Sequence, residues 1–379
     1  MRILFTISPL AAHLAAMLPM IQAASAASHE VVIATGPDLT AEIQRRGYQC
    51  WSAGPSADES WAELNERPAA IDDAERRRLT ASILHAQPAV ARLRDLLPRA
   101  QRWSPDLVVH DLTDAAGAEI AALTGARPIV HGISAQTNRQ LAMLRLVTAE
   151  FATSLMLPDR FAEVLAAPFL DPIPAFLQPP APLLFSRVHP VRPEVDAART
   201  CERLPLRVQR FGYDRTVLLA LGPGQRREVL AAAVEVISHF EVNLLVETGP
   251  RIEVGVLGSV PKHVAVARRM CPALALPLST AVISHGGTET VLGAAAYGLP
   301  QILLPQAGDQ RHNAVTVNRS GGGIAISPQP LVPGALRRAL ADVLANPAYA
   351  RTARSHQAAI AAMPTAAAVL DHLTAAVAV

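Results

Sequence analysis

The sequence predicts an α/β protein made of two doubly wound, Rossmann-like domains, each with a parallel sheet. Short continuous apolar runs alternate with helical patterns, which is typical of parallel strands covered by helices on both faces. The alternation stops in a proline-rich stretch, residues 158–193, and then begins again. The length of 379 residues suits two domains, and the 50% of apolar residues can fill two cores.

The first half contains four expected strands with helical patterns between them. The strands are Ile3–Ile7, Val31–Ala34, Leu107–His110 and Pro128–His131, and the helices are His13–Ala27, Leu39–Arg46, Ala115–Leu123 and Asn138–Phe151. Another helical pattern covers Asp72–Arg102. We expect breaks in it at Pro88 and Pro98, because proline removes a helical hydrogen bond.

Prolines crowd the stretch Pro158–Pro193, and proline can continue neither a helix nor a central strand. We therefore expect a connector here. The predicted organisation is an N-terminal domain (1–200), a linker (201–214), a C-terminal domain (215–362) and a last helix (363–379) that packs back on the N-terminal domain.

The second half repeats the alternation of strands and helices. The expected strands are Val217–Leu221, Val242–Glu247, Val264–Ala267, Ala281–Ser284 and Gln301–Leu304. The expected helices are Arg226–His239 and Thr288–Tyr297, a helix beginning at Asn313, and helical patterns from Gly334 to Ala378.

Composition excludes several classes of protein. A formal net charge of +2 gives no strong field for nucleic acid. The three cysteines, Cys50, Cys201 and Cys271, are odd in number and widely spaced, which argues against a disulfide framework or a zinc site. The apolar N-terminus resembles a strand and helix more than a signal peptide, and no other apolar run is long enough for a membrane span. We therefore expect a cytoplasmic protein without nucleic-acid partners.

The segment Ser284–Thr290, with the sequence SHGGTET, directly follows a strand and opens a helix. Gly286 and Gly287 let the backbone approach a ligand closely, and the helix start offers free N–H groups to an anion. His285, Thr288 and Thr290 add side-chain donors. A diphosphate fits this arrangement, although the same residues are also compatible with a tight turn that binds nothing.

A second polar group follows the strand Gln301–Leu304. Asp309 and Gln310 lie beyond its carboxyl end, the edge at which open α/β sheets bind ligands. A carboxylate and an amide can each take two hydroxyls of a sugar. The alternative for Asp309 is an N-cap of the following helix.

The spacing of these residues resembles the donor signature of family 1 glycosyltransferases with the GT-B fold, most of all the bacterial members that decorate antibiotics. The matching residues are His285-Gly286-Gly287, Gly298, Pro300, Pro305, Asp309-Gln310 and Asn313-Ala314. The resemblance implies two Rossmann-like domains facing across a cleft. The N-terminal domain would bind the acceptor and the C-terminal domain the nucleotide sugar.

The resemblance also gives roles to residues of the first half. His13 follows the first strand, where family members carry a catalytic histidine, and Asp111 resembles the aspartate that pairs with it. An imidazole can take the proton of an attacking hydroxyl, and a carboxylate behind it holds the tautomer. No Asp-x-Asp pair or His/Cys cluster occurs, so we expect neither a metal nor another cofactor.

Three positions depart from the family pattern. Glu289 places a carboxylate beside the expected phosphates, unless it points outward and complements the helix dipole. Pro223 follows Gly222 where relatives often carry a hydroxyl. Met270-Cys271 stands where many relatives have Trp-Val, in the region expected to contact the base.

The leading hypothesis is an inverting transfer of a sugar to a hydroxyl of an apolar natural product, with His13 as the general base. The donor would be a nucleoside diphosphate sugar, and the family branch implies a thymidine-linked deoxysugar. Glu289 and Asp309 keep a nucleotide-sugar epimerase or hydrolase open. Glu289 and Pro223 keep open a helper protein without activity. The sequence leaves the acceptor, the sugar and a homodimer undetermined.

Overall fold

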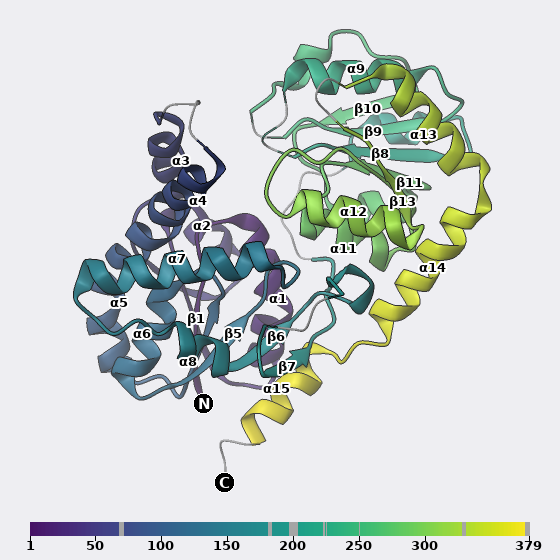
Figure 1. The fold of residues 1–379 in the computed structure, drawn as a ribbon. Coiled ribbons are helices and arrows are strands. Elements are labelled where there is room, and N and C mark those ends of the chain that lie inside the picture. The colour runs from purple at the N-terminus through teal and green to yellow at the C-terminus, as the bar shows by residue number, and fades with distance from the viewer. Residues whose placement is uncertain are drawn as a thin grey trace. The chain divides into compact units, whose positions relative to one another are not determined.

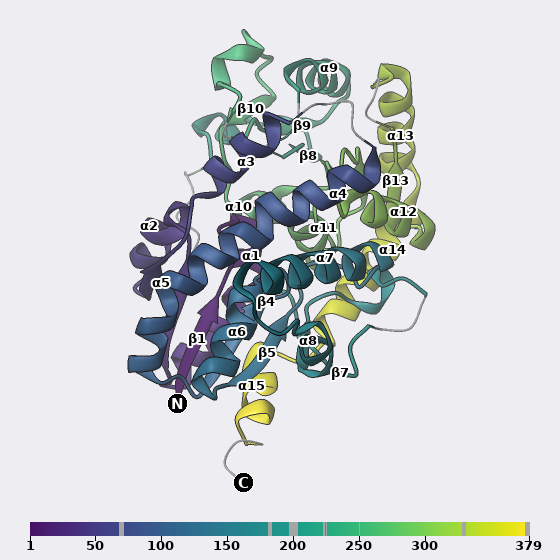
Figure 2. The same cartoon turned by 60° about the vertical axis from the view of Figure 1, so that its left-hand side comes forward.

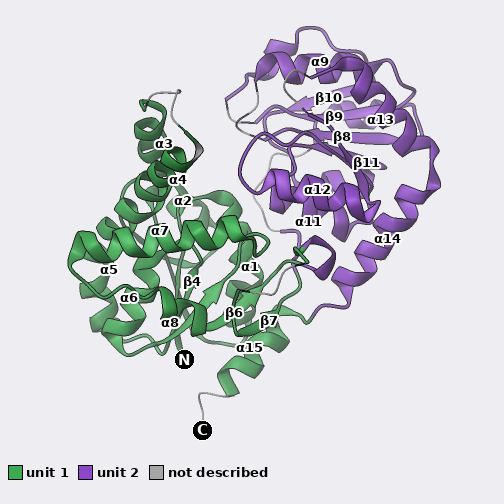
Figure 3. Cartoon of the chain, viewed as in Figure 1, with its two compact units in different colours: residues 1–173, 178–192, 364–379 green, residues 174–177, 193–363 purple. Residues whose placement is uncertain are grey.

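The computed structural model describes residues 1–67, 72–180, 184–196, 204–222, 224, 226–249, 251–327 and 331–375. Contacts divide the chain into two compact units (Figure 3). Unit 1 comprises Met1–Ile173, Gln178–Arg192 and Pro364–Val379, and unit 2 comprises Pro174–Leu177 and Pro193–Met363. The prediction of two parallel-sheet α/β domains is confirmed. The domain boundaries at 200, 214 and 362 stay a prediction.

Unit 1 contains a seven-stranded parallel sheet with the order β3-β2-β1-β4-β5-β6-β7. The strands are β1 Arg2–Thr6, β2 Glu30–Thr35, β3 Gln49–Ser52, β4 Leu107–Asp111, β5 Arg127–His131, β6 Pro168–Asp171 and β7 Arg187–Pro190 (Figure 1). The strand order changes direction between β1 and β4. Such a switch point opens a crevice at the carboxyl ends of the two strands, where doubly wound sheets bind ligands.

Helices cover both faces of this sheet. On one face, Ile3 and Phe5 pack with apolar residues of α1, α2 and α15, and on the other face Leu4 packs with α5 and α6. The alternation follows from the two-residue period of a strand. The helices are α1 Ala11–Ala26, α2 Pro37–Arg45, α3 Ala57–Asn65, α4 Asp73–Ala81, α5 Gln87–Trp103, α6 Ala115–Thr124, α7 Asn138–Leu155, α8 Phe161–Ala166 and α15 Ala366–Ala375.

The expected breaks at Pro88 and Pro98 are wrong. A single π-helical turn, η1 Ser82–Ala86, joins α4 to α5, and the three segments run on as one helical stretch (Figure 2). Pro88 directly follows the π turn, and Pro98 lies inside α5 without ending it. The buried face of α5, with Leu93 and Leu96, keeps the segment helical in spite of the two prolines, because packing contributes most of the stability of a helix.

The proline-rich stretch is more than the connector that we predicted. It contains strands β6 and β7, which extend the sheet of unit 1. Pro168 is the first residue of β6, and Pro190 is the last residue of the edge strand β7. Proline is tolerated at both kinds of position because a backbone N–H is dispensable there.

Unit 2 has a six-stranded parallel sheet with the order β10-β9-β8-β11-β12-β13, and its switch point lies between β8 and β11. The strands are β8 Thr216–Ala220, β9 Asn243–Glu247, β10 Val264–Ala267, β11 Ala281–Ser284, β12 Gln301–Leu303 and β13 Gly323–Ala325. Strand β13 escaped prediction. Its three residues, with burial decreasing along the strand, are too short for a periodic signal.

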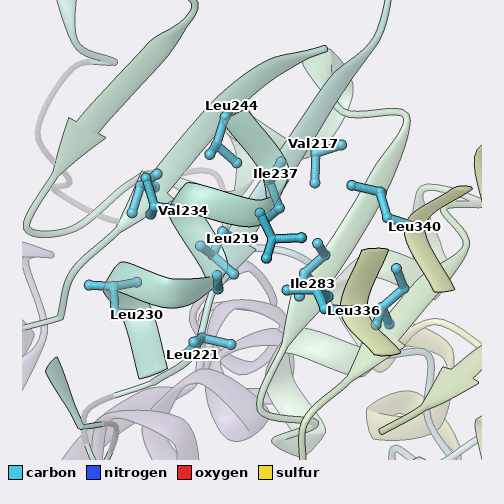
Figure 4. Close-up of a cluster of buried hydrophobic side chains, with 14 of the residues drawn as sticks. Val217, Leu219, Leu221, Leu230, Val234, Ile237, Leu244, Ile283, Leu336 and Leu340 are labelled. Carbon is cyan, nitrogen blue, oxygen red and sulfur yellow. The ribbon is translucent and has the colours of Figure 1, made fainter. Parts of the chain in front are cut away.

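The largest core of unit 2 lies between its sheet and helices α9 and α13. Figure 4 shows Leu219 of β8 and Ile283 of β11 among Ile237 of α9 and Leu336 of α13. The helices are α9 Arg227–Ser238, α10 Pro272–Ala275, α11 Thr288–Ala296, α12 Gln310–Ser320, α13 Pro333–Ala345 and α14 Pro347–Ala361. Short 3-10 helices lie at η2 Ala175–Leu177, η3 Leu206–Arg210, η4 Val254–Leu257 and η5 Leu276–Leu278.

The helical stretch Pro347–Ala375 is long and apolar enough to cross a membrane by length and composition alone. Core helices of water-soluble proteins pass the same test, and this stretch carries Arg351 and Arg354. Its apolar residues Ile360 and Leu370 are buried. The expected absence of a membrane span stays a prediction.

Candidate active site

In unit 1, His13 and Asp111 lie together at the switch point of the sheet. His13 is in the first turn of α1, just after β1, and Asp111 is the last residue of β4. His13 Nδ1 lies 3.0 Å from Asp111 Oδ2. The side chain of His13 keeps 12% exposure, while that of Asp111 is fully buried. The sequence-predicted pair therefore forms, with an accessible imidazole in front of a buried carboxylate.

Three further hydrogen bonds hold the carboxylate of Asp111. Oδ2 accepts from the N–H of Ser8 at 2.7 Å, and Oδ1 accepts from the N–H and hydroxyl of Thr113, both at 2.7 Å. Burial would raise the pKa of Asp111, but the positive potential of His13 and these hydrogen bonds hold that pKa well below its ordinary value. The carboxylate therefore stays ionised. Because it can only accept, Nδ1 of His13 carries the proton of this bond, and Nε2 is the ring atom that can act as a base when it is unprotonated.

His85 is a further histidine near this pair, and it belongs to none of the sequence motifs. It lies in the π turn η1, and its buried Nδ1 has no hydrogen-bond partner among the described residues. Burial, and after it the positive potential of His13, lower the pKa of His85 to about 4. His85 is therefore a neutral imidazole near the His13–Asp111 pair. The one feature of the sequence that pointed to this segment is Pro88 inside a helical pattern, because a proline there predicts a local distortion of the helix. Such distortions include π turns, which occur often at functional sites.

Asp171, the last residue of β6, is another buried carboxylate at this edge of the sheet. Its Oδ2 accepts from the side-chain amides of Gln136 at 2.9 Å and Gln178 at 2.7 Å, and its Oδ1 accepts from the N–H of Ile173 at 3.0 Å. Burial raises the pKa of Asp171 to about 6, and the three hydrogen bonds offset this only in part.

The raised pKa of Asp171 predicts a pH-dependent stability. The folded state binds this proton more tightly than the unfolded state, in which aspartate titrates near pH ~4. The stabilisation by the proton is full below pH ~4 and is lost as the pH rises through about 6. Relative to D171N, the parent protein should lose on the order of 2 kcal/mol of unfolding free energy across this window. Urea unfolding at a series of pH values measures it, and parallel curves for the two proteins would contradict it.

In unit 2, the ring of His285 lies between two glycines. A Cβ on Gly222 would come within 2.9 Å of the ring, and a Cβ on Gly287 within 2.5 Å of its Nε2. Gly222 follows β8 and His285 follows β11, so both stand at the switch point of the second sheet. Burial lowers the pKa of His285, while its contact with the carbonyl of Ala220 at 3.4 Å opposes this effect. An anion beside the ring would favour the imidazolium, which donates from both nitrogens.

Gly287→Ala is expected to weaken binding of thymidine diphosphate about tenfold or more, the cost of losing one hydrogen bond to a charged group. The backbone of Gly287, with φ −62° and ψ 144°, suits alanine, so the effect would come from the displaced ring of His285. Calorimetric titration measures the affinity. Gly212→Ala is the control, because its added Cβ would meet nothing within 4 Å. Equal affinities for the two variants would show that the position of His285 does not matter.

Asp309 does not cap the helix that follows it. Helix α12 begins at Gln310, earlier than the expected Asn313, and Asp309 stands at its N-cap position without a capping bond. Its Oδ2 instead accepts from the hydroxyl of Thr288 at 2.6 Å and from the N–H of Thr288 at 3.3 Å. Asn313, which is 2% exposed, bonds the same hydroxyl at 3.1 Å and the carbonyl of Gly286 at 2.9 Å. The two predicted polar groups are thus joined into one network, with Asn313 as a member to which no role was assigned.

The remaining predicted residues lie as follows. Thr290 and Glu289 are half-buried in the first turn of α11. Met270 and Cys271 are buried, and Met270 packs in the core beside Leu276, which follows α10. Their assignment as base contacts stays a prediction. Pro223 lies outside the described residues, and within those residues no group of three His, Cys, Asp or Glu side chains could hold a metal ion.

Residues 227–376 match a protein family described as the C-terminal domain of erythromycin biosynthesis protein CIII-like proteins. Over 387 residues, the chain is 28% identical to the elloramycin glycosyltransferase ElmGT of Streptomyces olivaceus, covering 98% of this chain and 97% of that protein. It is 26% identical to the 10-deoxymethynolide desosaminyltransferase of Streptomyces venezuelae, covering 98% and 96% of the two chains.

Solved structures agree on the fold. The glycosyltransferase VinC in complex with DTDP superposes with a TM-score of 0.81 at 22% identity, covering 99% of this chain and 98% of that one. The spinosyn rhamnosyltransferase SpnG gives a TM-score of 0.80 at 24% identity, covering 99% and 100%. The chain therefore has the GT-B fold. Residues 227–376 form an EryCIII-like C-terminal domain, and the homologues and structural neighbours of the chain are antibiotic-biosynthesis glycosyltransferases of the GT-B type.

Proposed function

We propose that this protein transfers a deoxysugar from a thymidine diphosphate donor to a hydroxyl group of an apolar natural-product aglycone, with inversion at the anomeric carbon. The observation that carries the proposal is the His13–Asp111 pair, an accessible imidazole oriented by a buried, ionised carboxylate. The relatives support the substrate classes, since they include a desosaminyltransferase and a structure holding thymidine diphosphate.

In this reaction, Nε2 of His13 takes the proton of the acceptor hydroxyl as its oxygen attacks the anomeric carbon. One carbon–oxygen bond forms while the bond between that carbon and the diphosphate breaks, and the diphosphate leaves with the electron pair. Asp111 holds the tautomer and stabilises the imidazolium that results.

The diphosphate would be received by unit 2. The N-terminus of α11 offers backbone N–H groups and the positive end of a helix dipole to its developing charge. His285 directly precedes the N-cap region of this helix, and Thr290 lies in its first turn. Within the described residues, no hydrogen bond uses the Thr290 hydroxyl, so it is available to a phosphate oxygen.

The test is incubation with thymidine diphosphate deoxysugars and a panel of polyketide aglycones, followed by mass spectrometry and assignment of the new anomeric centre. The expected product is a glycoside with inverted configuration. Turnover of the donor without an acceptor would favour the epimerase or hydrolase instead. A protein that binds no thymidine diphosphate in calorimetry would favour the helper without activity.

A further inference from the structure

A chain of hydrogen bonds connects Asn313 of α12 to Thr288 of α11 and then to Asp309. The amide nitrogen of Asn313 lies 3.1 Å from Thr288 Oγ1, and this Oγ1 lies 2.6 Å from Asp309 Oδ2. The amide nitrogen also reaches the carbonyl oxygen of Gly286 at 2.9 Å. All of these atoms belong to unit 2 and surround the start of α11.

The chemistry of the groups fixes the direction of each bond. The carbonyl of Gly286 and the carboxylate of Asp309 can only accept, and the NH₂ group of Asn313 can only donate. Its two protons go to the nearer acceptors, Gly286 and Thr288, while Asp309 Oδ2 lies farther away at 3.5 Å. The hydroxyl of Thr288 has one proton, which points to Asp309. The N–H of Thr288 points to the same carboxylate oxygen at 3.3 Å.

We propose that Thr288 is a positioning residue for the donor sugar, which holds Oδ2 of Asp309 so that Oδ1 faces the sugar. Thr288 then has no proton to give to a diphosphate, and this revises the phosphate contact expected from the sequence. Thr290, two residues further along α11, becomes the side-chain phosphate donor. The inference rests on the proposed function, because it concerns the sugar half of the same donor site.

The side-chain oxygen of Gln310 is also engaged by hydrogen bonds within the protein. Its Oε1 accepts from the N–H of Gln306 at 2.8 Å and from that of Ala307 at 3.1 Å, which leaves its NH₂ group for a ligand. Asp309 and Gln310 thus present one free carboxylate oxygen and one NH₂ group to the donor sugar.

The experiment compares Thr288→Val, Thr288→Ser and Thr290→Val. In Thr288→Val, valine keeps the shape of threonine without its hydroxyl proton, and the affinity for thymidine diphosphate should stay within about threefold of the parent. The kcat/KM for transfer should fall about 10- to 100-fold, the range for losing a hydrogen bond to a charged group. Thr288→Ser should restore most of the activity. Thr290→Val should instead weaken binding of thymidine diphosphate about tenfold.

A tenfold loss of thymidine diphosphate affinity in Thr288→Val, or no rescue by Thr288→Ser, would overturn the positioning role. If Thr288→Val does not fold, the test compares the kcat/KM of Thr288→Ser with that of the parent. The serine variant should keep at least about a third of the parent's kcat/KM, and a larger loss would contradict the proposal. A parent that binds no thymidine diphosphate would refute the proposed function, a result distinct from these.

Discussion

Replacing His13 with alanine is expected to lower kcat for sugar transfer about 1,000-fold or more, within the range measured for loss of a positioned general base. The acceptor hydroxyl is a poor nucleophile, and water cannot take its proton with the same placement. Binding of thymidine diphosphate should be unchanged, because His13 lies in unit 1 and the expected diphosphate contacts lie in unit 2. Initial rates at saturating donor measure the effect.

Asp111→Asn tests whether the pair acts as a unit. Asparagine keeps the shape but cannot hold the Nδ1–H tautomer as an ionised carboxylate does, so we expect a loss approaching that of H13A. The double variant should be no worse than H13A alone, because both changes remove the same function. His239→Ala, an exposed histidine on unit 2, is the matched control and should transfer at the parent rate. Activity of H13A near that of the parent would exclude the general-base assignment.

Arg92→Ala is expected to destabilise the fold by about 3–5 kcal/mol, the usual result of breaking a buried ion pair on one side. Arg92 of α5 and Asp114 at the start of α6 are both 0% exposed, and Arg92 Nη2 lies 2.7 Å from Asp114 Oδ1. Without Arg92, the carboxylate would stay buried with no opposite charge. Thermal unfolding should show a melting temperature lower by roughly 10 °C, from about 2–4 °C for each kcal/mol in a domain of this size.

The double variant Arg92→Met with Asp114→Leu should regain most of the lost stability, because well-packed apolar residues can replace a buried pair at little cost. Arg94→Ala is the matched control. Arg94 lies on the same helix and is exposed, so its removal should change the unfolding free energy by about 0.5 kcal/mol or less. Equal melting temperatures for the Arg92 and Arg94 variants would show that the ion pair contributes nothing.

The order of strands and helices could be predicted because each element carries its signal locally. Continuous apolar runs such as Leu107–His110 and Ala281–Ser284 sit in the structure as β4 and β11. The strands that were missed lack such a run: β3 has four residues and β13 has three, and β6 and β7 contain prolines at positions where a strand tolerates them. The π turn before Pro88 could not be predicted either, because a helical period does not distinguish a π turn from the α-helix around it.

The fold class, the histidine beside two glycines at a helix start and the aspartate–glutamine pair after a strand can all be predicted from local sequence. Which of these groups bond to each other depends on how the chain folds. His13 and Asp111 are separated by 98 positions and become neighbours through the pairing of β1 with β4. Thr288 reaches Asp309 across 21 positions, and this contact engages the hydroxyl proton of the threonine. A hydroxyl has one proton, and the local sequence does not show which acceptor that proton reaches. The acceptor depends on how the strands and helices pack, because packing brings residues that are distant in the sequence within hydrogen-bond distance.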